Sequence, residues 1–137
     1  MARDIIHDAV RKALEKDKWL ITDDPLDIRL EGTTLYIDLA TERVLEAQKG
    51  KEQIIVEIKS LSKRSLLESI YGALGQYIIY RDALEEVEIK RAIYLAIAAQ
   101  KYERLKEIPF LLRSLEKNGV KLIIVNIKEQ KIEAWKK

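Results

Sequence analysis

The sequence of 137 residues has no cysteine, one histidine, two prolines and five glycines. The lack of cysteine excludes a disulfide framework, a thiolate metal site and a cysteine nucleophile. One histidine is too few for a zinc site of the usual multi-histidine kind. A Ser-His-Asp triad would have to use His7, and no serine lies in an elbow-like turn. The five glycines match neither a phosphate-binding loop nor a dinucleotide-binding fingerprint.

Long hydrophobic runs are also lacking. The longest, residues 92–99, is far shorter than the ~20 residues that cross a bilayer. The first twelve residues mix acids with bases and have no apolar core, so nothing indicates export. Hydrophobic residues make up 47% of the chain and charged residues 35%, which excludes a disordered tail. We expect one soluble cytoplasmic domain over residues 1–137, not bound to a membrane.

The chain also lacks an excess of charge of one sign, because it has 25 Lys and Arg residues and 23 Asp and Glu residues, for a net charge of +2. Strong non-specific DNA binders usually carry a basic face or tail. Small local excesses occur around Lys59, Lys63 and Arg64, and again at Lys90 and Arg91. Their ordinary interpretation is a solvated rim, so charge permits DNA binding without indicating it.

Apolar periodicity predicts alternating helices and strands. We expect helices at 3–18 and 65–86, strands at 34–40, 53–60, 92–98 and 121–127, a short strand at 28–30, one or two helices at 101–118 broken near Pro109, and an edge strand at 132–135. Residues 41–51 are predicted to be a polar connection, in which one helical turn can form. Gly72 and Gly75 lie inside the long helix, where close packing against the sheet would compensate their low helix propensity. The fold class is α/β, with a mixed sheet flanked by helices on both sides.

Charged residues in otherwise apolar strands mark the candidate site. Asp38 lies in one predicted strand, and Glu57 and Lys59 share one face of the next. If these strands form a hairpin, Asp38 lies across from the other two. Converging carboxylates suit Mg²⁺ or Mn²⁺, and a neighbouring lysine can orient or deprotonate water, which is the chemistry of phosphodiester hydrolysis. Equally, Glu57 and Lys59 can be ordinary solvent-facing strand residues.

Two further pairs extend this set. Gln76 and Tyr80 stand four residues apart on the long helix and so share a face, while His7 and Asp8 lie early in the first helix. Taken alone, the first pair is typical of a polar helix edge, and His7 of a boundary histidine. Together with Asp38 and Glu57-x-Lys59, they resemble the PD-(D/E)XK nuclease superfamily in its RecB-type form.

The resemblance is closer to one family. The segments RDIIHDAVRKALEKDKW, YIDLA, IVEIKS, ALGQYIIYRDALE, AIYLAI and KLIIVNIKEQKIEAWKK are together similar to the XisH family, over almost the entire chain. That family is named for control of the excision of the fdxN element, which interrupts a cyanobacterial nitrogen-fixation gene. The resemblance implies a restriction-endonuclease-like fold and a companion protein, XisI.

Carried over to this sequence, the resemblance implies a role for each candidate. Asp38 and Glu57 would bind the metal, with His7 as a further ligand, and Lys59 would be the catalytic lysine. Gln76 and Tyr80 would orient the DNA backbone or the lysine. The sequence departs from the superfamily pattern at two places: Ile37, not proline, precedes Asp38, as in many other members that lack this proline, and the first helix carries His7-Asp8 instead of a clear glutamate.

Three functions follow from these residues. The first is a Mg²⁺- or Mn²⁺-dependent DNA endonuclease acting in excision. The second is a catalytically inactive accessory protein that binds XisI, a site-specific recombinase or DNA. The third is a toxin- or defence-like nuclease held in check by XisI, which uses the same residues. A homodimer through the edge strand at 132–135 is a further expectation, because Trp135 has no evident role in the core.

Overall fold

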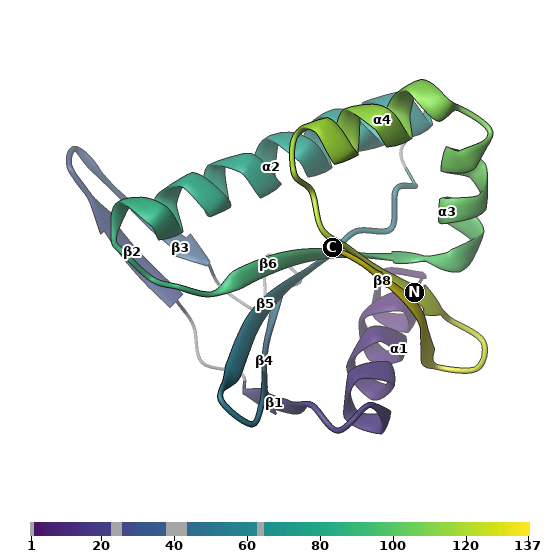
Figure 1. Ribbon diagram of the computed structural model, residues 1–137, viewed down its shortest axis with the longest axis horizontal. Helices are drawn as coiled ribbons and strands as arrows, with labels where there is room; N and C mark the ends of the chain where they lie inside the picture. The colour runs from purple at the N-terminus through teal and green to yellow at the C-terminus, as the bar shows by residue number, and fades with distance from the viewer. Residues whose placement is uncertain (1, 23–25, 38–43, 63–64) are drawn as a thin grey trace.

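The computed structural model describes residues 2–22, 26–37, 44–62 and 65–137, and Figure 1 shows their arrangement. The helices are α1 (Ala2–Lys16), α2 (Leu66–Glu86), α3 (Ala99–Lys106) and α4 (Pro109–Lys117). The strands are β1 (Leu20–Thr22), β2 (Leu26–Leu30), β3 (Thr33–Ile37), β4 (Val44–Lys49), β5 (Glu52–Ile58), β6 (Ala92–Ala98), β7 (Leu122–Asn126) and β8 (Lys131–Lys136).

Six strands form a central mixed sheet in the order β1-β4-β5-β6-β7-β8, and β2 and β3 form a separate two-stranded sheet. The inner strands β5, β6 and β7 run parallel, whereas β1, β4 and β8 pair antiparallel with their neighbours. Helix α2 makes the crossover from β5 to β6, and α3 and α4 make the crossover from β6 to β7. Parallel neighbours require such crossovers, and the helices cover the sheet they connect.

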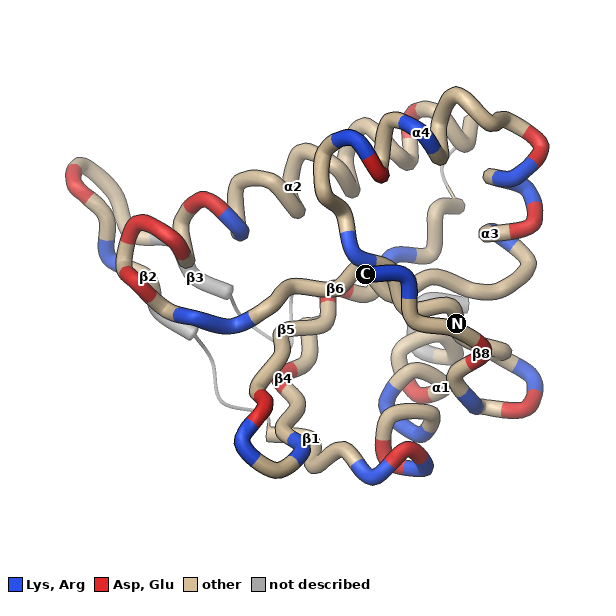
Figure 2. The backbone as a smooth tube through the Cα atoms, viewed as in Figure 1, with Lys and Arg blue, Asp and Glu red and all other residues tan. Residues whose placement is uncertain are grey.

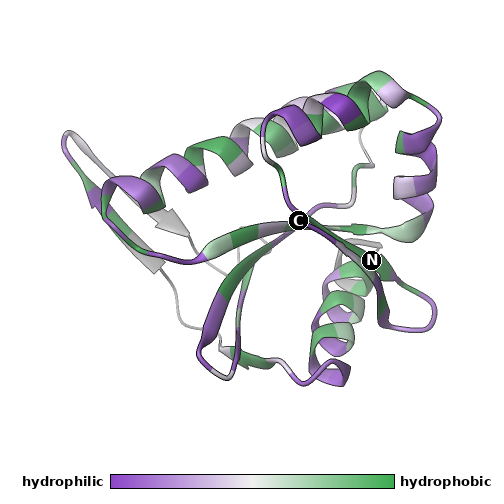
Figure 3. Cartoon of the chain, viewed as in Figure 1, coloured by the Kyte–Doolittle hydropathy of each residue, from purple (hydrophilic) through white to green (hydrophobic). Residues whose placement is uncertain are grey.

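Helices lie on both faces of this sheet, as the sequence predicts (Figure 1). Alternate residues of each strand enter one of two cores. Ile55, Ile93 and Ile97 pack with apolar residues of α2, α3 and α4. Val56 and Tyr94, which point the other way, pack with apolar residues of α1. Much of β5 and β6 is green in Figure 3, which fits inner strands that are covered on both faces.

The predicted polar connection at 41–51 is wrong in its second half, because Val44–Lys49 is strand β4. Leu45 and Ala47 point into the core beneath α1, while Val44 belongs to the opposite core. Charged residues within the segment mask this alternation in the sequence. Strand β4 is the antiparallel partner of β5 and places Val44 opposite Glu57.

The hairpin considered between the strands at 34–40 and 53–60 is therefore also wrong. Strand β3 pairs with β2, with Leu35 opposite Ile28, and belongs to the smaller sheet. That sheet packs on the α2 side, where Ile28 is buried in the core. The short strand predicted at 28–30 is confirmed and extends back to Leu26.

The two glycines of α2 do not pack against the sheet, contrary to prediction. Gly72 and Gly75 are both exposed, and a Cβ built on Gly75 meets nothing within 4 Å. The helix instead begins at a good cap, because the Ser65 hydroxyl accepts a hydrogen bond of 3.0 Å from the Glu68 backbone N–H. Its buried face is formed by other residues, among them Ile70, Ala73 and Tyr77.

Replacing Gly75 by alanine is therefore expected to stabilise the protein. Alanine favours an exposed helix interior over glycine by about 0.8–1 kcal/mol, and this site has room for the methyl group. Urea denaturation followed by circular dichroism measures the change. Gly119→Ala is the contrasting variant, since Gly119 has φ +69 and its Cβ would lie 3.2 Å from Arg81 Nη1. A loss of stability in Gly75→Ala would contradict the expectation.

Strand β8 is the edge strand predicted near 132–135, and Trp135 has a place within the chain. Its ring lies 5.7 Å from that of Trp19 and 5.1 Å from that of Tyr94, which it meets edge-on. These contacts join the end of the sequence to the segment after α1. Trp135, which suggested a homodimer because it had no evident role in the core, thus contacts other rings within the chain, and the dimer stays a prediction. No helix in the described part of the chain is long and apolar enough to cross a membrane.

Candidate functional site

Glu57 is a charged residue in the middle of the apolar sheet. It is 0% exposed, and both of its carboxylate oxygens are buried. Because Ile55, two residues earlier, packs in the core beneath α2, strand alternation directs Glu57 to that same face. Its neighbours across the sheet are Val44 on β4 and Leu95 on β6. A buried carboxylate on a central strand is costly unless the surroundings satisfy it, which favours a specific role.

Helix α2 covers this face and brings polar side chains to it. The Gln76 side-chain amide donates a hydrogen bond of 2.8 Å to the Tyr80 hydroxyl, as their shared helix face predicts. Tyr80 is buried, and so is the amide oxygen of Gln76. The four-residue spacing thus produces one connected polar unit on the sheet side of α2.

Tyr77, which the sequence analysis did not single out, links α2 to the strands. Its hydroxyl donates a hydrogen bond of 2.8 Å to Ile93 O and accepts one of 3.1 Å from the Lys121 backbone N–H. Burial raises the pKa of the Tyr77 phenol, and the charge of Glu57 adds to the rise, while the Lys121 hydrogen bond and the Arg81 charge oppose it. Tyr77 thus connects α2 to β6 and to the residue before β7.

Lys59 directly follows strand β5 and is half-buried. Its backbone N–H donates a hydrogen bond of 3.1 Å to Ala96 O, so the ladder with β6 continues to this residue. Alternation therefore gives Glu57 and Lys59 the same side of the strand, as predicted. The pair combines an anionic and a cationic group at the carboxyl end of a central strand.

His7 and Asp38 differ from the other candidates in where they lie. His7 is on α1, which packs on the face opposite to α2, and its Nδ1 lies 4.0 Å from the Asp8 carboxylate. The structure therefore assigns His7 to a different layer from Gln76 and Tyr80. Asp38 lies outside the described residues. It precedes by six positions Val44, the residue opposite Glu57.

Among the described candidates, Glu57 has the donor chemistry that a divalent metal would need. Among all the residues that the structure describes, no group of three or more histidine, cysteine or acidic side chains is placed to hold a metal ion. The buried carboxylate of Glu57 is a hard oxygen donor of the type that Mg²⁺ and Mn²⁺ prefer. The donor chemistry of Glu57 fits such a metal, and a second carboxylate is required to complete the pair.

A second buried acid was missed by the sequence analysis. Glu46 of β4 is 7% exposed and forms a hydrogen-bonded ion pair with Arg91, which precedes β6. The pair spans strand β5 on the α2 side of the sheet. Its partner Arg91 lies 45 residues away in the sequence, so the local pattern of residues 44–49 gives no signal of the pair.

Fold and site define an α/β protein whose central mixed sheet carries a buried acid and a lysine beneath its longest helix. The chain belongs to the XisH family, because the family model described as "XisH protein" matches residues 1–133. No curated protein matches the chain.

Two solved structures agree with this assignment. One is described as an fdxN element excision controlling factor protein from Anabaena variabilis; it is 35% identical, has a TM-score of 0.85, and the match covers 98% of this chain and 99% of that one. The other is an XisH family protein from Nostoc punctiforme PCC 73102, also 35% identical with a TM-score of 0.85, covering 98% and 100% of the two chains.

Proposed function

We propose that this protein is a DNA-element excision controlling factor with a Mg²⁺- or Mn²⁺-dependent, PD-(D/E)XK-type site for phosphodiester hydrolysis. The observation that carries the proposal is the buried Glu57 followed by Lys59 on the same side of β5, beneath a helix that presents Gln76 and Tyr80. The role in excision rests on membership of the XisH family and on the name of the relative from Anabaena variabilis.

In this proposal Glu57 and Asp38 bind the metal. The sequence supports the pairing, since only five residues separate Asp38 from the strand residue opposite Glu57. When bound, the metal would polarise the scissile phosphate and stabilise the leaving oxygen. The role of His7 as a further metal ligand rests on the family resemblance alone.

The chain's own residues do the rest of the work. The Lys59 ammonium group orients the attacking water and offsets the charge of the phosphate. Gln76 and Tyr80, already hydrogen-bonded to each other, position the DNA backbone or the lysine. The burial of Glu57 keeps bulk water from its carboxylate, which strengthens its electrostatic interactions.

Cleavage of supercoiled and branched DNA tests the proposal, with Mg²⁺, with Mn²⁺ and with EDTA. Wild type is compared with Glu57→Gln, which removes the charge and keeps the shape, and each is assayed with and without an XisI-like companion. We expect cleavage that requires the metal and falls at least about 100-fold in Glu57→Gln. Glu52→Gln, at the exposed start of β5, is the matched control and should cleave like wild type.

An accessory function is the second candidate, and the outer face of α2 favours it. Leu67, Tyr71 and Ile79 are 41%, 65% and 57% exposed and follow one another at multiples of four residues. Such a row is typical of a helix that binds a partner. If no DNA is cut under any condition while a complex with an XisI-like companion or a recombinase forms in wild type and Glu57→Gln alike, the nuclease proposal is wrong and the accessory function is supported.

A further inference from the structure

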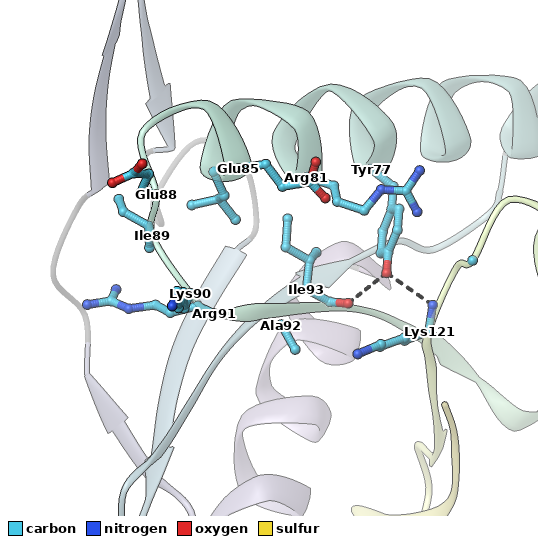
Figure 4. A pocket seen from close by; sticks show the side chains of 12 residues that line it. Tyr77, Arg81, Glu85, Glu88, Ile89, Lys90, Arg91, Ala92, Ile93 and Lys121 are labelled. Carbon is cyan, nitrogen blue, oxygen red and sulfur yellow. Dashed lines mark hydrogen bonds between the residues drawn. The ribbon is translucent and has the colours of Figure 1, made fainter.

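Tyr77 lines the first of two adjoining hollows, but neither hollow is lined by Glu57, Lys59, Gln76 or Tyr80. The first, of about 740 Å³, lies between the end of α2 and the start of β6, as Figure 4 shows. The second, of about 600 Å³, lies between α3, α4 and the end of β8. Gly119 and Lys121 line both, so the two hollows form one continuous surface.

This surface is basic. We define the basic band as the six cationic residues that line the two hollows: Arg81, Lys90, Arg91, Lys121, Lys136 and Lys137. Three acids line them as well: Glu85, Glu88 and Glu116. The lining therefore has a net charge of +3, whereas the remaining 19 basic and 20 acidic residues have −1. Figure 2 shows the blue segments at the start of β6 and beside the end of the chain.

Few of these cations are neutralised by ion pairs. Within the described part of the chain, Arg91 alone among the six forms one, with Glu46. Several of the others lie over aromatic rings, which fixes their position without removing their charge. Arg81 lies 5.7 Å from the centre of the Tyr77 ring, and Lys136 lies 5.7 Å from that of Tyr102. Arg81 also donates a hydrogen bond of 2.6 Å to Asn118 O.

We propose that the basic band binds the sugar–phosphate backbone of a nucleic acid, at a surface that neither Glu57 nor Lys59 lines. The cations come from α2, from the segment before β6, from the start of β7 and from the end of β8. A ligand that reaches all of them must be extended and repeatedly anionic. Duplex DNA presents one charge per about 1.7 Å of its axis, which matches such a row of positive side chains.

The test replaces the two exposed ends of the band in Lys90→Gln/Lys136→Gln. The matched control is Lys12→Gln/Lys51→Gln, which removes the same charge from exposed positions on α1 and in the β4–β5 turn. Anisotropy of a fluorescein-labelled DNA of about 30 base pairs, and of its single strand, is followed in EDTA between about 50 and 200 mM KCl. EDTA prevents metal-dependent cleavage, so binding is measured independently of the proposed nuclease function.

We expect the band variant to bind about tenfold more weakly at low salt, with a plot of log affinity against log salt that is shallower by about 2. The control variant should bind like wild type, and melting temperatures should show that both fold. Equal binding by the two variants would overturn the proposal, as would no binding of either DNA by wild type. Glu57→Gln should bind normally even if it does not cleave, so the two proposals fail separately.

Discussion

Cleavage by Lys59→Met is expected to be at least about 100-fold slower than by wild type, because a positioned group that orients or deprotonates water contributes about 10²–10⁴ to the rate. Methionine keeps the apolar stem of lysine and removes the ammonium group. The backbone N–H of Lys59 still donates to Ala96 O, so the ladder between β5 and β6 is retained. The rate is measured under single-turnover conditions with saturating Mg²⁺.

Lys51→Met is the control, since Lys51 is exposed in the turn that precedes the same strand, β5. DNA affinity in Ca²⁺ separates binding from chemistry: Lys59→Met should lose rate with less than about a tenfold change in affinity. Cleavage at the wild-type rate by Lys59→Met would refute the assigned role. A rate lost in step with affinity would instead make Lys59 a DNA-binding residue.

Arg91→Met is expected to lower the free energy of unfolding by roughly 2–4 kcal/mol, because it removes the Arg91 guanidinium group from the buried Glu46 carboxylate. The side chains of Arg91 and Glu46 are only 28% and 10% exposed. The pair joins β4 to the beginning of β6 across β5, so its loss should also weaken the packing of three neighbouring strands. Urea denaturation measures the change.

The double variant Glu46→Leu/Arg91→Met tests the cause. Replacing a whole buried ion pair by apolar residues is often neutral, so the double variant should recover most of the stability that Arg91→Met loses. Lys90→Met, beside Arg91 and exposed, should change stability by less than about 0.5 kcal/mol. A double variant as unstable as Arg91→Met would show that Arg91 acts by packing and not through Glu46.

Most helices and inner strands could be predicted from the sequence, because their apolar residues follow clear periods. The predictions at 65–86 and 92–98 agree with α2 and β6 to within one residue. Pro109 separates α3 from α4 as predicted, and lies in the first turn of α4. Strand β4 was missed because Glu46 stands at a core position, where its partner Arg91 lies 45 residues away. Local pattern cannot reveal such a partner.

The sequence predicts those features of the candidate site that depend on the spacing of neighbouring residues within one strand or helix. The i, i+2 relation of Glu57 and Lys59 and the i, i+4 relation of Gln76 and Tyr80 follow from strand and helix geometry alone. Strand pairing depends on the tertiary fold, so local spacing could not identify β4 as the partner of β5. Local spacing also gave no reason to select Tyr77. The role of Tyr77 depends on Ile93 and Lys121, which only the folded sheet brings to its hydroxyl.

The contact between Trp19 and Trp135 allows intrinsic tryptophan fluorescence to follow the folding of the chain. These are the only two tryptophans in the sequence, and their rings lie 5.7 Å apart. Indole emission therefore reports on the docking of the segment after α1 against the edge strand β8 and on the packing of Trp135 against Tyr94. The signal from backbone circular dichroism comes largely from helices, of which α2 is the longest. Comparing the rates of the two signals during refolding would show whether the α1 face of the sheet is covered before or after helix α2 forms on the other face.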